Sequence, residues 1–217
     1  MVRPAPVILI LSLLVGGCQT APPPKPLPRT ASVTVEEEAE PWEGTATTAG
    51  RAAIDAIALR WPQALADTRR RGGTRAIAAE GALLEPQAAL ARAAPSPGPY
   101  RCRVFRLGIQ VGRARGLGPV RSGFCYVGVE GDQLSLSSEI AGHRLGGYLY
   151  DTSASTRLIF LGAAAPARGR APGYGGDAAK DLAGHFERVD DFRYRLVIPG
   201  AGPTELRVFE LLAAPDP

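Results

Sequence analysis

The sequence is poor in the side chains that most often carry catalysis or bind metal ions. It has only two histidines, His143 and His185, and three cysteines among 217 residues. The cysteines show none of the close pairing that structural zinc sites use, so we expect no metal cluster. The chain also lacks a phosphate-binding loop and an activated-nucleophile motif. These absences argue against the common metal-, nucleotide- and cofactor-dependent enzyme classes, and we expect no cofactor.

Lysine is scarce as well, since Lys25 and Lys180 are the only two in the chain. Positive charge therefore comes almost wholly from arginine, and the formal net charge is +4 at pH 7. A basic chain can indicate a nucleic-acid-binding protein. Here the arginines are scattered among 21 acidic residues rather than gathered in one patch. We therefore expect no nucleic-acid partner.

Long apolar runs are missing except at the N-terminus, where residues 1–17 have the layout of a signal peptide. Arg3 supplies the positive end, and the apolar run 7–15 is too short to span a bilayer as a helix. The segment 15–18, Val-Gly-Gly-Cys, then resembles the bacterial lipobox, whose cysteine becomes the acylated first residue of the mature protein. We predict a lipid anchor on Cys18. The alternative is a signal peptide followed by an incidental cysteine.

The residue after Cys18 bears on the destination of the protein. It is Gln19, and not the aspartate that usually signals retention in the inner membrane. We therefore expect a cell-envelope protein anchored in the outer membrane and facing the periplasm. Residues 18–41 are the predicted disordered tether, because 21–28 is rich in proline and 36–38 is a run of glutamates. Such a segment is stiff and polar, and it spaces a domain from a membrane surface.

Cys102 and Cys125 are the two cysteines that remain after lipidation. In an oxidising compartment an even remainder indicates one disulfide. We predict that this pair joins the first two strands of the domain. Two separate buried thiols are the alternative interpretation.

Residues 42–94 are rich in alanine and are predicted to be helical. The apolar residues at the spacing of one buried helix face are Ile54, Ile57, Ala58, Trp61 and Leu65. Because proline interrupts a helix, we predict that the first helix ends near Arg60 and that a second begins at Pro62. Residues 74–80 and 86–92 are each predicted to form a further short helix.

From Tyr100 the apolar residues alternate with polar ones, so the period changes from that of a helix to that of a strand. The region 95–213 then reads as about eight short strands. After the strand that begins at Tyr100, they cover 122–130, 133–139, 144–150, 157–161, 183–189, 192–198 and 205–212. An antiparallel meander of this size commonly closes into a barrel, because closure removes exposed edges.

We therefore predict an α+β fold, in which an N-terminal helical segment packs on a mostly antiparallel small barrel whose architecture resembles that of lipocalins. The alternative is an open curved sheet with the helices across one face. Residues 42–213 are expected to form one structural unit.

Several short segments of this region form a recognisable set. They are 100–104, 107–108, 124–125, 157–162, 174–177, 181–184, 187–188 and 193–197. Together they resemble an uncharacterised family of Gram-negative periplasmic lipoproteins with a domain of unknown function, over roughly residues 42–212. The resemblance implies a location in the cell envelope and a fold, but no activity.

Residues 174–181 are the most site-like stretch. Glycine lets a backbone approach a ligand closely, and Asp177 and Asp181 are four residues apart, on one face if the turn is helical. With Tyr174 they form a candidate binding set that suits a cation. The favoured interpretation is an aspartate-capped turn between two strands.

Aromatic residues of the strands form the second candidate set. Tyr148, Tyr150, Phe192 and Tyr194 are predicted to face the barrel interior, where they would contact a small ligand. Ordinary core packing explains them equally well.

The predicted function is a non-enzymatic binding, inhibitory or scaffolding barrel that holds a small apolar molecule or an envelope protein. One alternative is an envelope hydrolase that uses His143 or His185 as a general base. Another is a purely structural envelope lipoprotein. Whether side chains fill the barrel interior is the observation that best separates these functions, and the sequence does not specify an oligomeric state.

Overall fold

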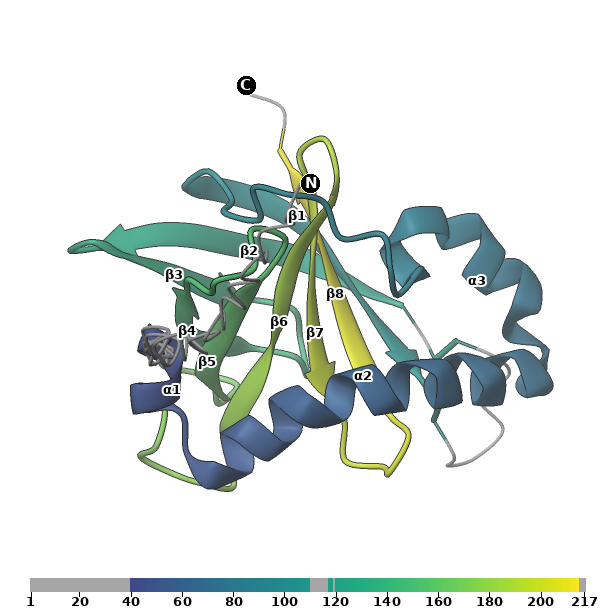
Figure 1. Ribbon diagram of the computed structural model, residues 1–217, viewed down its shortest axis with the longest axis horizontal. Coiled ribbons are helices and arrows are strands. Elements are labelled where there is room, and N and C mark those ends of the chain that lie inside the picture. The colour runs from purple at the N-terminus through teal and green to yellow at the C-terminus, as the bar shows by residue number, and fades with distance from the viewer. Residues whose placement is uncertain (1–39, 110–116, 119, 215–217) are drawn as a thin grey trace, which may run out of the picture. The chain divides into compact units, whose positions relative to one another are not determined.

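The computed structural model describes residues 40–109, 117–118 and 120–214. Its body is a closed antiparallel barrel, in which each strand pairs with the next and the last pairs with the first (Figure 1). The predicted α+β class with a small eight-stranded barrel is confirmed. The predicted signal peptide, Cys18 and nearly all of the predicted tether lie outside the described residues.

The strands lie within a few residues of their predicted positions. They are β1 (Gly98–Leu107), β2 (Arg121–Glu130), β3 (Gln133–Ser138), β4 (Leu145–Tyr150), β5 (Leu158–Ala164), β6 (Asp181–Asp190), β7 (Arg193–Pro199) and β8 (Leu206–Ala213). Tight turns join several of these strands, which explains why the alternation of apolar and polar residues predicted the strand positions so closely. At Gly131, between β2 and β3, φ is 64°, a conformation that glycine adopts without steric cost.

The helical layer precedes the barrel in the chain. It contains α1 (Pro41–Thr45), α2 (Thr48–Thr68), the π-helical turn η1 (Arg69–Gly73), α3 (Thr74–Glu80) and the short 3-10 helix η2 (Gly81–Leu84). Within the described residues, no helix combines the length and the apolar character needed to cross a membrane.

Two predictions about the helices are wrong. Helix α2 continues through Pro62 without a break, because Trp61 and Ala64 on either side of the proline are both buried against the barrel, and this packing outweighs the lost backbone hydrogen bond. Residues 86–92 do not form a helix. They make turns there, and Leu90 forms an isolated bridge with Arg188 of β6. The helix predicted at 74–80 is confirmed as α3.

Side chains fill the interior of the barrel. Phe160, Phe186 and Phe209 are almost completely buried there. The other large members of this core include Tyr100, Leu136, Ile140, Leu149, Tyr194, Leu196, Ile198 and Leu211. The pockets described below open on the outer surface, so a ligand site has to be sought outside the barrel.

A second core lies between the barrel and the helices. Helix α2 runs across the outer face of β6, β7 and β8 (Figure 1). Its Ile57, Trp61 and Leu65 pack with outward residues of the wall, among them Phe105 and Val208. These strands are buried on both faces, so the charged residues Glu187, Arg195 and Glu210 on their outer face are buried as well.

The disulfide between Cys102 and Cys125 is present, and the prediction is confirmed. Their Cα atoms are 5.8 Å apart, and the bond links β1 to β2. Both cysteines belong to the interior core, so the disulfide is buried inside the barrel.

A row of alternating charges crosses the outer wall beneath the helical layer. Arg103 of β1 is the cross-strand partner of Glu210 in β8, which pairs with Arg195 of β7, which pairs in turn with Glu187 of β6. Arg157, just before β5, lies 2.8 Å from Glu187 and ends the row. We call these five residues the charge belt. Opposite charges on neighbouring strands stabilise the sheet.

Candidate functional site

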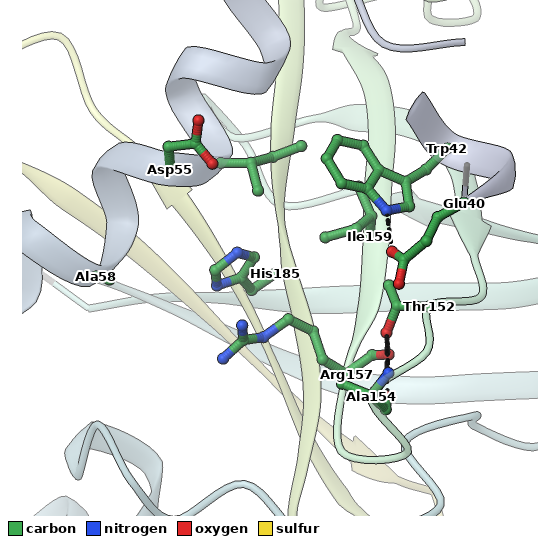
Figure 2. Close-up of a pocket in the computed structure, with 10 residues that line it drawn as sticks. Glu40, Trp42, Asp55, Ala58, Thr152, Ala154, Arg157, Ile159 and His185 are labelled. Atoms are coloured by element: carbon green, nitrogen blue, oxygen red, sulfur yellow. Dashed lines mark hydrogen bonds between the residues drawn. The ribbon is translucent and has the colours of Figure 1, made fainter. Parts of the chain in front are cut away.

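A pocket of about 350 Å³ opens between the helical layer and the outer wall of the barrel (Figure 2). Its lining comes from the start of α1, from α2, from the β4–β5 loop and from β5 and β6. The lining residues are Glu40, Trp42, Ile54, Asp55, Ala58, Thr152, Ala154, Arg157, Ile159 and His185. Segments that are far apart in the sequence therefore meet in one site.

His185 is the polar centre of this pocket. Its neighbour in β6, Phe186, points into the barrel, so His185 lies on the outer face, where it is only 7% exposed. Burial, followed by the nearby charge of Arg157, lowers its pKa to about 4. Among the described residues, none forms a hydrogen bond with its ring. The neutral imidazole therefore offers one donor and one acceptor to a pocket occupant.

Arg157 supplies a cation on the same side of the pocket (Figure 2). Its Nε and Nη2 lie 2.9 Å and 2.8 Å from Oε1 of the buried Glu187. The ion pair neutralises much of the charge and fixes the guanidinium in place. The side chain is 38% exposed, so its remaining N–H groups are accessible from the pocket.

Glu40 holds together two segments at the edge of the pocket. Its carboxylate accepts one hydrogen bond from the indole N–H of Trp42 and another, at 2.7 Å, from the backbone N–H of Ser153. Hydrogen bonds from Ser153, and then from Trp42, lower the pKa of Glu40. The start of α1 is thereby joined to the β4–β5 loop, and the indole is held in the pocket wall.

The pocket combines apolar walls with a few polar groups, which is the usual construction of a small-molecule site. Trp42, Ile54 and Ile159 supply the walls. Nucleophilic catalysis would need a hydroxyl or thiol beside the base. The lining contains no serine or cysteine, and the hydroxyl of Thr152 donates to the carbonyls of Ala154 and Arg157, at 3.1 Å and 2.9 Å.

His143, the other histidine predicted as a possible base, does not line this pocket. It lies in the β3–β4 loop at one end of the barrel, where its ring packs edge-on against Phe209, with 6.2 Å between ring centres. Burial, followed by the charge of Arg207, lowers its pKa. The two histidines therefore belong to different surroundings.

The predicted site at residues 174–181 is an internally bonded turn. Asp177 forms an ion pair with Lys180 at 2.8 Å and accepts a hydrogen bond from the backbone of Ala179. Asp181 accepts one from the backbone of Gly175 at 2.9 Å. Both carboxylates thus hold the turn together. No cluster of three or more potential metal ligands occurs in the described parts of the chain.

Tyr174 faces the helical layer. Its hydroxyl lies 3.0 Å from Oγ1 of Thr47, the residue that caps α2, and it sits directly over Gly50. A side chain at position 50 would collide with this hydroxyl. Tyr174 therefore anchors the start of α2, and a role in ligand binding stays a prediction.

The orientation predicted for three of the aromatic residues is wrong. Tyr148 and Tyr150 lie on the outer face, because it is Leu149 that points into the barrel. Phe192 occupies the β6–β7 turn with a φ of 55° and is 71% exposed. Tyr194 is confirmed as an interior residue, stacked 5.7 Å from Phe186.

Tyr148 and Tyr174 both line a groove of about 700 Å³ on the outer wall of β3 and β4. Both hydroxyls are already engaged there, since Tyr148 donates to Glu130 at 2.7 Å and Tyr174 contacts Thr47. Other polar side chains also line the groove, among them Ser135, Ser137 and Arg170. Its role in binding remains a prediction.

Sequence reasoning found His185 but missed its surroundings. Trp42, Arg157 and Glu40 stand in short segments without a motif, and no spacing in the chain connects them. The available signal was the run Arg157–Gly162 of the family resemblance, which contains both Arg157 and Ile159 of the pocket wall.

Comparison with known proteins shows which family the chain belongs to. Residues 42–211 match the model of a family described as a domain of unknown function, DUF4893. The chain belongs to this family. The resemblance noted from the sequence is thereby confirmed, and the match covers both the helical layer and the barrel of this DUF4893 member.

The other comparisons add little. No curated protein matches the chain. A solved structure described as a surface lipoprotein shows 10% sequence identity and a TM-score of 0.29, over 52% of this chain and 60% of that one. A likeness of this size supports no inference about the fold or function of the DUF4893 member.

Proposed function

We propose that the chain is a lipid-anchored protein of the cell envelope, held in the outer membrane and facing the periplasm, and that it works as a non-enzymatic binding module. The apolar run 7–15 and the lipobox-like segment 15–18 support the anchor. The proline-rich segment 21–28 suits a module that reaches a ligand or partner away from a membrane surface.

The observation that carries the binding function is the imidazole of His185, which is buried, neutral and without a hydrogen-bond partner among the described residues. The ring nitrogens of His185 are not among the fully buried side-chain atoms that lack a hydrogen-bond partner, so they are accessible to an occupant of the pocket. A neutral ring offers that occupant one donor and one acceptor. The apolar walls, the imidazole and the remaining N–H groups of Arg157 suit a small molecule with an apolar body and one group that accepts hydrogen bonds.

The filled barrel interior separates this proposal from a lipocalin-like mode of binding. Eight-stranded barrels hold a ligand at the centre only where side chains leave room. Here the centre is occupied by Phe160, Phe186 and Phe209. The ligand is therefore expected outside the barrel, between the wall and α2.

The test uses the purified full chain and 1-anilinonaphthalene-8-sulfonate, a fluorescent probe with an apolar body and a sulfonate group that accepts hydrogen bonds. Ala58→Trp fills the pocket, since Ala58 lines it and is exposed. Leu59→Trp is the matched control, because Leu59 is 72% exposed and does not line it. We expect Ala58→Trp to weaken probe binding by roughly tenfold or more, and Leu59→Trp to leave it unchanged. Equal binding by both variants contradicts the proposal.

A hydrolase panel on the same protein separates the enzymatic alternative. Hydrolytic turnover that His185→Ala abolishes would replace the binding module by a hydrolase. Native mass spectrometry of the protein purified from its producing cell adds an independent readout. A small molecule bound to the natural chain and missing from Ala58→Trp supports the proposal.

A further inference from the structure

One end of the barrel carries arginines that the function proposed above does not use. Arg106 of β1, Arg207 of β8 and Arg121 of β2 stand near the ends of their strands, in phase with interior residues such as Val104 and Phe209. Arg106 and Arg207 are cross-strand partners. Arg121 is the partner of Val104, two residues before Arg106. The sheet thus brings three guanidinium groups to one end.

The loop between β3 and β4 closes the same end. Ile140 is completely buried in the interior core, and His143 follows it with its ring against Phe209. All three arginines act on His143 and, with its burial as the larger cause, lower its pKa. The imidazole is therefore neutral at pH 7 and lies within electrostatic range of the three cations.

Negative charge does not balance this cluster within the described residues. Glu205 is the one carboxylate that acts on His143. It pairs with Arg106, whose Nε and Nη2 both lie 2.8 Å from its Oε1. Glu205 also acts on Arg207, but three guanidinium groups less one carboxylate still leave an excess of two positive charges.

Two buried nitrogen atoms at this end lack a hydrogen-bond partner in the described part of the chain. They are Nε of Arg207 and Nδ1 of His143. The hydrogen bond from Nη2 of Arg207 to the carbonyl of Pro199 is long, at 3.4 Å. Unsatisfied buried donors and uncompensated positive charge both cost free energy, and a single bound anion offsets both.

We propose that this end of the barrel binds a small oxyanion of the phosphate type, held by Arg207, Arg121 and His143. Guanidinium groups bind phosphate oxygens through paired, charge-assisted hydrogen bonds. A neutral imidazole adds one donor. The same chemistry recognises free phosphate and the phosphate of a lipid headgroup.

Isothermal titration calorimetry of the purified full chain with inorganic phosphate tests the site, at an ionic strength held constant with sodium chloride. We expect saturable binding that Arg207→Met weakens by roughly tenfold or more, as the loss of charge-assisted hydrogen bonds implies. Arg121→Met should also weaken it, and because Arg121 is exposed, this variant keeps the test valid if Arg207→Met does not fold. Arg75→Met, an exposed position on α3, is the control and should bind like the natural chain.

A second arm uses phosphatidylcholine vesicles with and without phosphatidic acid. Binding that requires phosphatidic acid and is lost in Arg121→Met assigns the anion to a lipid headgroup. Binding of free phosphate alone assigns it to a soluble ion. The proposal is overturned if neither probe binds, or if both arginine variants bind as well as the natural chain. These outcomes do not depend on the His185 pocket.

Discussion

The guanidinium of Arg195 lies against the carboxylate of Glu187, with Nη2 2.7 Å from Oε2. Both side chains are buried, although they stand on the outer face of the barrel. Arg195 also donates to four backbone carbonyls between residues 82 and 86 and lies 4.7 Å from the centre of the Trp61 ring. One buried ion pair therefore joins the barrel wall to the helical layer.

Removal of the acid from this pair is expected to be costly. Glu187→Gln leaves the Arg195 charge buried without its carboxylate, and breaking a buried pair in this way costs about 3–5 kcal/mol of unfolding free energy. The double variant Glu187→Gln, Arg195→Met should lose less than the sum of the two single variants. Urea unfolding of all three measures this.

The control for that cycle is Asp177→Asn, which breaks an exposed ion pair with Lys180 and should cost less than about 1 kcal/mol. A loss as small as this for Glu187→Gln would mean that the charge belt does not hold the helical layer to the barrel.

His185 should make the fold sensitive to acid. Its pKa falls from an ordinary 6.5 to about 4 in the folded chain, so between these pH values the unfolded chain binds a proton that the folded chain does not. Its stability contribution is complete above the unfolded pKa and is lost as the pH falls toward the folded pKa. The loss is roughly 3 kcal/mol over the whole window.

Comparison of the natural chain with His185→Gln isolates this contribution from other titrating groups. Urea unfolding at about pH 7 and about pH 4.5 should show the free-energy difference between the two proteins moving in favour of the variant at the lower pH. A difference that does not change with pH contradicts the prediction.

Cys18→Ala removes the residue predicted to carry lipid. We expect the variant to leave the membrane fraction of the producing bacterium and to be recovered in the soluble fraction. Thr20→Ala, two residues on, preserves the lipobox-like segment and should remain with the membrane. Unchanged membrane association of Cys18→Ala would exclude the anchor.

The bond between Cys102 and Cys125 spans 23 residues of sequence, and a loop of this length stabilises a fold by about 3 kcal/mol in the chain-entropy model. Maleimide labelling of the denatured mature protein should modify neither cysteine before reduction and both after it. Reduction should also lower the midpoint of urea unfolding. Complete labelling without reduction would show that the bond does not form in the cell.

Local patterns predicted the barrel because its elements are local. Alternating apolar and polar residues, together with turn residues, identify a strand within about ten positions. Each strand here pairs with its sequence neighbour, so little information about contacts between distant residues was needed to predict the sheet. Pro62 shows the limit of this reasoning. The break that a proline causes in an isolated helix is absent where a long apolar face is held by a sheet.

The candidate site was harder to predict, since it depends on which face of the barrel is covered. The alternation of residues 192–198 puts Arg195 on the outer face of the barrel, and it does lie there, but α2 and the residues after it bury it. Trp42 meets His185 only because α1 and α2 lie across the wall, whereas the pairing of β5 with β6 brings Arg157 there. The spacing of residues in a single sequence does not predict a contact between a helix and a distant strand.

The closure of the barrel has a consequence for how the protein is made. β1 pairs along its length with β8. One edge of the first strand of the barrel therefore stays unpaired until the last strand has been synthesised. Contacts between such distant residues form late, because a long loop has to close first. Until residues 206–213 are available, β1 and β7 each present an unpaired edge on which another chain can add a strand. A chain that ends before β8 therefore loses both its closure and its protection from aggregation.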